Sequence, residues 1–221
     1  MATGSAELSG FPAFGHRGRT VGSPREPEEL IRAELFSIER LEQHGESLAT
    51  AQGVTVARGR GRPLVTRLRD NGRVLLGAYR AIAVAIREER AITPAAEWLV
   101  DNFHVVEEQI REIRDDLPAG YYRQLPKLAA GPLAGYPRVF GLAWAFVAHT
   151  DSLLDPQTLC RFVRAYQRVQ PLTIGELWAV AITLRIVLVE NLRRSAEGIV
   201  SRRTARQQAD SLADRLLEAD A

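Results

Sequence analysis

Four residues of the types used in acid–base or metal chemistry recur at helical spacing in the middle of the sequence. They are Glu97, Asp101, His104 and Glu108, separated by four, three and four positions, so on a helix they share one face. Di-iron bundles use a Glu-x-x-His motif from each of two helices. Here Asp101-x-x-His104 has no second helix to pair with. The pattern favours a polar face that hydrogen-bonds to neighbouring segments, with an enzyme or metal site on this face as the alternative.

The helix that carries this polar face has a clear start and a clear apolar stripe. Thr93 can accept hydrogen bonds from free N–H groups, and Pro94 occupies the first helical position, where a missing N–H is tolerated. We expect the helix to end near Pro118 and a short helix to follow over residues 121–127. The apolar positions alternate in steps of three and four: Leu99, Phe103, Val106, Ile110, Ile113 and Leu117.

The same periodicity predicts helices over residues 28–51, 65–89, 138–150, 155–169 and 174–203. Thr173 and Glu176 have the spacing of a capping box at the start of the last of these. That helix is apolar around most of its circumference, so we expect it to be central, with Trp178 in the core and any buried charge paired. The sequence predicts an all-α, compact bundle of six to eight helices. Its expected parts are a disordered tail over 1–27, a helical domain over 28–203 and a C-terminal amphipathic helix or linker over 204–221.

Composition restricts the class of protein. The 221 residues carry 29 basic and 27 acidic side chains, which is no global signal for nucleic acid or membrane binding. No secretory signal is recognisable, and no apolar run reaches the roughly 18 residues of a membrane span. A cytoplasmic protein is therefore expected. The single cysteine, Cys160, cannot form an internal disulfide and is expected to be a buried thiol.

Several catalytic signatures are missing from the sequence. It contains no phosphate-binding Gly-x-x-x-x-Gly-Lys-Ser/Thr loop, no dinucleotide fingerprint, no nucleophile elbow and no cysteine–histidine zinc spacing. Arginines alternate with glycines from Arg58 to Arg62. One short tract without aromatic residues favours a flexible loop, and an anion or nucleic-acid contact is the alternative. No cofactor is predicted.

Four stretches of the chain resemble a known family. They are ELFSIERLEQHGESLA (34–49), RLRDNGRVLLGAYR (67–80), the segment from EWLVDNFHVVEEQ to FVAHTD (97–151), and RFVRAYQRVQPLTIGELWAVAITLRIVLVENLRR (161–194). Together they resemble the N-terminal region of bacterial cyclic β-1,2-glucan synthases over roughly residues 28–203. The polar motifs DNFHVVEEQ, LPKLA and PLTIGELW make the resemblance specific to this family, because helix packing alone does not require these residues.

The resemblance implies a function that the residues alone do not. In that family the region precedes membrane spans, a glycosyltransferase domain that uses UDP-glucose and a glycoside-phosphorylase-like domain. The resemblance therefore implies that this chain is a non-catalytic accessory domain or a truncated fragment at the cytoplasmic face of the inner membrane. The partners would be the synthase's glycosyltransferase and membrane domains, β-1,2-glucan or UDP-glucose, and not nucleic acid. A shared polar groove is predicted from these residues: Glu97, Asp101, Asn102, His104, Glu107, Glu108, Tyr121, Tyr122, Lys127, Glu176, Arg185 and Asn191.

Overall fold

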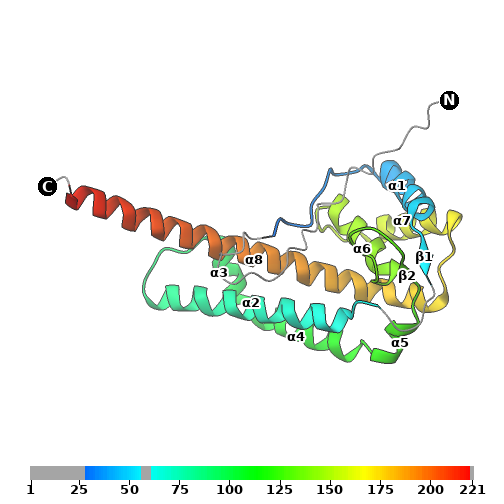
Figure 1. The fold of residues 1–221 in the computed structure, drawn as a ribbon, viewed down its shortest axis with the longest axis horizontal. Coiled ribbons are helices and arrows are strands. Elements are labelled where there is room, and N and C mark those ends of the chain that lie inside the picture. The colour runs from blue at the N-terminus through cyan, green and yellow to red at the C-terminus, as the bar shows by residue number, and fades with distance from the viewer. Residues whose placement is uncertain (1–27, 56–60, 220–221) are drawn as a thin grey trace.

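A computed structural model describes residues 28–55 and 61–219 of the chain; the predicted N-terminal tail lies outside these residues. Within them the chain forms eight helices and two short strands (Figure 1), which confirms the all-α prediction. The strands, β1 (Val54–Thr55) and β2 (Lys127–Leu128), pair antiparallel. The helices are α1 (Ile38–Ala51), α2 (Leu64–Arg87), α3 (Pro94–Asp101), α4 (Phe103–Asp115), α5 (Ala119–Gln124), α6 (Arg138–His149), α7 (Pro156–Val169) and α8 (Ile174–Ala219).

Helix α8 is the axis of the molecule, as its apolar sequence predicts. It runs the length of the fold in Figure 1, with α2, α3 and α4 packed along one part of it and α6 along another. Helices α1 and α7 pack against each other, and α1 also contacts α6. Helix α8 continues past residue 203 to Ala219, so one helix includes most of the predicted C-terminal amphipathic helix or linker over residues 204–221. Its side chains from Gln208 to Glu218 are all exposed, so the last turns extend beyond the packed body.

Side-chain caps mark the starts of four of the eight described helices, α1, α3, α7 and α8. Thr93 caps α3 by accepting from the Ala96 N–H at 3.3 Å. At α8, the predicted capping box is confirmed. The Glu176 N–H donates to Thr173 Oγ1 at 3.2 Å, and the Thr173 N–H donates to the Glu176 carboxylate at 2.9 Å. Each bond satisfies an N–H group that the helix geometry leaves without a partner.

The predicted helix over residues 28–51 is wrong in its first ten residues, because α1 begins only at Ile38. The preceding segment is held by tertiary hydrogen bonds. The Ile31 N–H donates to Asn191 Oδ1 at 2.8 Å, and the Ala33 N–H donates to the Ala148 carbonyl at 2.9 Å. The carbonyls at the end of α6 have no partner within their own helix. The segment satisfies them, and this long-range bonding outweighs its local helical preference.

Three other expectations need correction. The helix predicted over residues 93–118 is broken at Asn102 into separate helices α3 and α4, and at this break the Trp98 carbonyl accepts from both the backbone N–H of Asn102 at 3.0 Å and its side chain at 2.8 Å. Trp178 is 80% exposed rather than in the core, because it lies on the face of α8 opposite the buried Glu176. Cys160 is exposed rather than buried, because the buried face of α7 is formed by its neighbours Phe162, Val163, Ala165 and Tyr166.

The expected pairing of buried charge is present around Glu190 of α8, which is only 1% exposed. Arg67 of α2 donates two hydrogen bonds to its carboxylate, and Arg194 donates a third at 3.0 Å. Burial alone would raise the pKa of Glu190, but the two guanidinium groups outweigh it and hold that pKa below its usual range. Arg67 also donates to the Tyr136 hydroxyl at 2.9 Å and lies over the ring of Trp144. One buried carboxylate thus ties α2 and α8 to the aromatic core.

We predict that Glu190→Gln lowers the free energy of unfolding by about 3 kcal/mol, since it removes the buried countercharge of Arg67 and leaves Arg194 with the exposed Glu28 as its acidic partner. Chemical denaturation followed by circular dichroism measures the change. Asp70→Asn is the matched control. Asp70 forms ion pairs only with exposed arginines among the described residues, so its loss should change stability by less than about 0.5 kcal/mol. Equal effects of the two substitutions would contradict the structural role of Glu190.

Two histidines meet at the junction of α1, α6 and the extended segment. His149 stacks on Phe36 with ring centres 3.9 Å apart, and the His44 ring lies 4.6 Å from His149. His149 Nδ1 lies 2.7 Å from the Glu34 carbonyl oxygen, so this nitrogen carries the proton and donates. Burial, together with the neighbouring His149, lowers the pKa of His44 to about 4, and burial lowers that of His149. Both imidazole rings are therefore uncharged in the folded protein at neutral pH.

This junction predicts a pH dependence of stability. Below the ordinary histidine pKa of 6.5 the unfolded chain binds a proton at His44, while the folded chain resists protonation down to about pH 4. The contribution of His44 to the free energy of unfolding is therefore complete above pH 6.5 and is lost as the pH falls from 6.5 to about 4. The loss from His44 amounts to about 2 kcal/mol between pH 7.5 and pH 5. Denaturation at both values, on the unsubstituted chain and on His44→Gln, should give a smaller loss for the variant. Identical losses would contradict the assignment.

Candidate functional site

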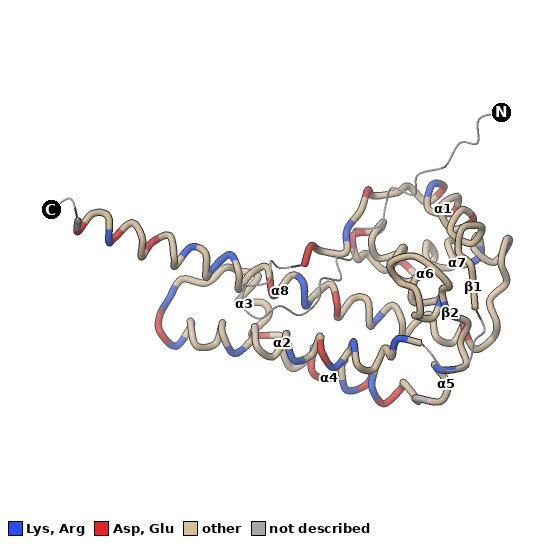
Figure 2. The backbone as a smooth tube through the Cα atoms, in the orientation of Figure 1, with Lys and Arg blue, Asp and Glu red and all other residues tan. Residues whose placement is uncertain are grey.

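The predicted acidic face lies on the surface of α3 and α4. Glu97, Asp101, His104, Glu107 and Glu108 are all exposed. Across residues 28–55 and 61–219, no group of three or more histidine, cysteine, aspartate or glutamate side chains is arranged to hold a metal ion. Helix α3 carries only acidic charges, whereas acidic and basic positions mix along α4 (Figure 2). The arrangement is that of a solvated, mixed-charge surface.

Three other predicted site residues are engaged in holding the fold. Lys127 is buried and donates to the carbonyls of Arg123 at 2.9 Å and Leu125 at 3.3 Å. Glu176 is fully buried and pairs with Arg138, whose Nη2 donates to it at 2.8 Å. Asn191 joins the extended segment to α8 as described above, and donates to Ser152 Oγ at 2.9 Å. These side chains lie in separate networks. Whether they contribute to ligand binding stays a prediction.

Tyr121 and Tyr122, by contrast, do line an open groove, together with the start of α8. We call it the aromatic groove; its volume is about 490 Å³. The two tyrosine rings meet edge to face, with centres 5.3 Å apart. The residues that line it are Asp116, Pro118, Tyr121, Tyr122, Ile174, Gly175, Trp178 and Ile182. The groove thus joins two predicted site residues to a tryptophan that the sequence had suggested for the core.

A hydrogen bond to α8 positions Tyr121. The Tyr121 hydroxyl donates to the Gly175 carbonyl in the first turn of α8, so α5 is fixed against α8. A side-chain β-carbon at Gly175 would meet the Tyr121 hydroxyl at 3.5 Å, which is ordinary contact distance. Trp178 and Ile174 stand on the opposite rim and are 80% and 77% exposed. The groove therefore presents large apolar surfaces that no described residue covers.

Arg185, another predicted site residue, stands one helical turn beyond the groove. It donates to Gln109 Oε1 at 2.9 Å and to Asp116 Oδ2 at 3.4 Å, and it also pairs with Glu112. Asp116 itself lines the groove. The arginine therefore fixes a carboxylate at the polar end of an otherwise aromatic and aliphatic surface.

The two tyrosines remain protonated at neutral pH. Burial, with the nearby charge of Glu176, raises the pKa of Tyr121. Burial, with Tyr121 and Asp116, raises the pKa of Tyr122. Neither phenol is set up as a base or a nucleophile, because both of those roles need a lowered pKa. What the groove offers is flat apolar area with hydroxyl and carboxylate groups at its edge, which is the composition of a binding surface.

The structure adds residues to this site that sequence reasoning missed. Trp178 and Ile174 were expected on the apolar surface of a central helix. The signal available in the sequence was their spacing of four, which puts Ile174 and Trp178 on one face of α8. Glu176, Ala179 and Thr183 lie on a different face, and that face is buried. A helix apolar all round does not reveal which face a domain leaves open.

The arginine–glycine tract falls mostly outside the described residues, which include none of Arg58–Arg60. Its last arginine, Arg62, is described. The guanidinium carbon of Arg62 lies 5.6 Å from the centre of the Tyr136 ring, and its N–H donates to the Gly135 carbonyl at 2.9 Å. This end of the tract therefore packs onto the start of α6. Among the described helices, none combines the length and hydropathy needed to cross a bilayer.

Comparison with known proteins agrees with the family resemblance of the sequence motifs. No protein-family model matches the chain. The chain is 42% identical over 201 residues to the cyclic β-(1,2)-glucan synthase NdvB of Rhizobium meliloti (strain 1021). The match covers 88% of this chain but only 7% of the synthase, so the chain spans a small part of its relative's length. The resemblance predicted from the sequence is confirmed: the chain is a relative of one segment of a cyclic β-(1,2)-glucan synthase.

Proposed function

We propose that this chain is a non-catalytic helical domain that supports UDP-glucose-dependent synthesis of β-1,2-glucan at the cytoplasmic face of the inner membrane. Its partners would be the glycosyltransferase and membrane domains of a synthase, with glucan as the ligand. The observation that carries the proposal is the 42% identity to a segment of a glucan synthase over most of this chain. A segment that is similar over so much of its length is expected to keep the same fold and a related role.

The non-catalytic part of the proposal rests on how the buried acids are used. Glu190 and Glu176 are the two carboxylates buried in the described core, and each is bound by arginine. General acids and bases instead need a pKa near the working pH and access to substrate. The acids of the α3–α4 face are exposed, and Glu107, which lines an open pocket of about 310 Å³ against α2, has no second acid beside it in that pocket. Support for a stand-alone enzyme on that face is correspondingly weaker.

The aromatic groove supports contact with glucan. Glucose rings carry C–H groups on their flat faces and hydroxyls around their edges. Tyrosine and tryptophan match this pattern, because each combines a large apolar face with a polar tip. Trp178 supplies the exposed face, the two tyrosines supply the wall, and Asp116 supplies an acceptor for sugar hydroxyls. Docking against another synthase domain uses the same exposed surface and is the competing outcome.

We predict that Trp178→Ala weakens binding of β-1,2-linked glucan about tenfold, since the substitution removes the most exposed aromatic face of the groove. Isothermal titration calorimetry with β-1,2-glucan oligosaccharides measures the change. Trp98→Ala is the matched control, because Trp98 is also exposed but lies on α3 outside the groove. Its affinity should equal that of the unsubstituted chain.

Three results would contradict the proposal. They are equal weakening of glucan binding by Trp178→Ala and Trp98→Ala, no glucan binding at all, and turnover of UDP-glucose by the purified chain alone. If glucan fails to bind while Trp178→Ala abolishes co-purification with the glycosyltransferase part of a synthase, the groove is a docking surface and not a sugar site.

A further inference from the structure

A second cavity lies far from the aromatic groove, between α8 and the connection from α2 to α3. Its volume is about 340 Å³. It is centred near Arg203, 25 residues after Trp178 on α8, which corresponds to roughly 37 Å along the helix axis. None of the predicted site residues lines it. The cavity is therefore independent of the proposed glucan contact.

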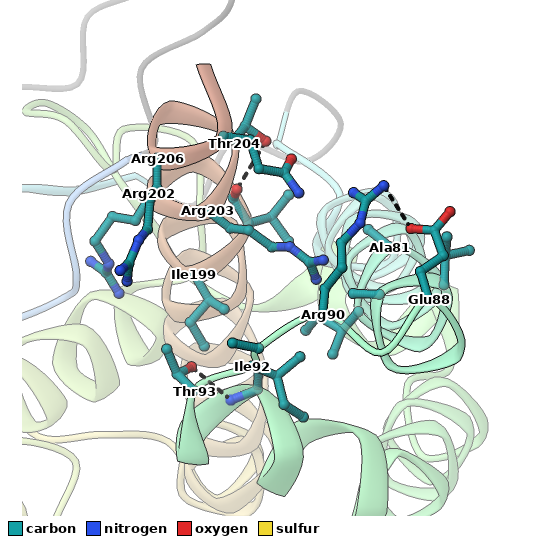
Figure 3. A pocket seen from close by; sticks show the side chains of 17 residues that line it. Ala81, Glu88, Arg90, Ile92, Thr93, Ile199, Arg202, Arg203, Thr204 and Arg206 are labelled. Atoms are coloured by element: carbon teal, nitrogen blue, oxygen red, sulfur yellow. Dashed lines mark hydrogen bonds and ion pairs between the residues drawn. The ribbon is translucent and has the colours of Figure 1, made fainter. Parts of the chain in front are cut away.

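The inner surface of this cavity is apolar. Ile82 and Ala85 of α2 are almost fully buried beneath it, and Ile92 of the connection and Ile199 and Val200 of α8 pack partly against the core. In Figure 3, Ile92 and Ile199 lie on facing sides of the space. A hydrocarbon group would bury apolar area here, which is favourable in proportion to the area removed from water.

The rim of the cavity is strongly basic. Four arginines line it, against a single carboxylate, Glu88, which pairs with Arg90 at 3.0 Å. Figure 3 shows Arg203 reaching from α8 toward Arg90 on the α2–α3 connection, while Arg202 and Arg206 lie together on another side of α8. The basic positions of this part of α8 are also visible along the tube in Figure 2.

Arg203 differs from the other inward-facing arginines of α8 and its neighbours. Arg67, Arg138 and Arg185 each meet a carboxylate. Within residues 28–55 and 61–219, Arg203 has no acidic partner and only partial exposure. Figure 3 shows the Arg90 guanidinium turned toward Glu88, so the charge of Arg203 beside it is the one left for an anion in the cavity to neutralise. Planar guanidinium groups also match the geometry of phosphate oxygens.

We infer that this cavity binds a phosphate-bearing amphiphile. Arg203 holds the phosphate, the positive field of Arg90, Arg202 and Arg206 attracts it, and a hydrocarbon portion lies on Ile92 and Ile199. The shared chemistry is an anionic phosphate ester attached to an apolar chain. Such a group occurs both in a bilayer, as an acidic lipid, and free in solution, as a soluble phosphate ester.

The test uses dihexanoyl phosphatidic acid, a soluble short-chain phosphate ester, titrated into the purified chain by calorimetry at low and high salt. We expect saturable binding that Arg203→Gln weakens at least tenfold and that rising salt weakens further. Arg164→Gln is the matched control, because Arg164 is exposed on α7, away from the cavity, and has no ion pair in the described part of the chain. It should leave the affinity unchanged.

Two further probes separate the parts of the inference. Inorganic phosphate should bind at least tenfold more weakly than the ester, and Ile199→Ala should weaken the ester but not inorganic phosphate. Vesicles of phosphatidylcholine with and without phosphatidic acid identify the source. Sedimentation only with the acidic vesicles, lost in Arg203→Gln, places the ligand in a bilayer, whereas binding of the soluble ester alone places it in solution.

Three results would overturn the inference: no binding of the ester at millimolar concentration, equal binding by Arg203→Gln and Arg164→Gln, or equal affinity for the ester and inorganic phosphate. None of these measurements involves glucan or Trp178. Failure here therefore leaves the proposed function standing, and failure of the glucan experiment leaves this cavity to be judged separately.

Discussion

The centre of the fold depends on pairing the buried carboxylate of Glu190 with positive charge. A carboxylate so deeply buried is tolerable only when positive charge reaches it with good hydrogen-bond geometry. Arg67 from α2 and Arg194 from α8 meet that requirement, and both guanidinium groups also lie over the Trp144 ring of α6. Three helices must therefore take up one relative position before the charge is satisfied. The Arg138–Glu176 pair repeats the arrangement at the start of α8.

The periodicity of the sequence predicts those helices whose buried face is set by their own residues. α2, α6, α7 and the central α8 follow from apolar spacing, and the caps at Thr93, Asp155 and Thr173 follow from side-chain chemistry. The segment before Ile38 does not, because its backbone partners lie on α6 and α8, far away in the sequence. Nor does the break at Asn102, because the buried apolar stripe continues across it from Leu99 to Phe103 and Val106.

The candidate site could be predicted only in part, for a related reason. Tyr121 and Tyr122 stand next to turn residues, so their placement at a helix end is readable from the sequence. Trp178 is not readable in this way, since an apolar residue on an apolar helix looks the same whether it faces the core or solvent. Glu176 and Arg185 were recognisable as polar residues on a buried helix, but their partners Arg138 and Glu112 come from elements that only the tertiary fold brings close.

Exposure of Cys160 on α7 has a practical consequence. It is the single cysteine of the chain, and its thiol stands on the outer side of a helix whose inner side packs against α1. A maleimide dye or spin label would therefore attach at one defined position without entering the core. Such a label would let distance measurements follow how this domain is oriented within a larger assembly, with no engineered cysteine and no loss of a native disulfide.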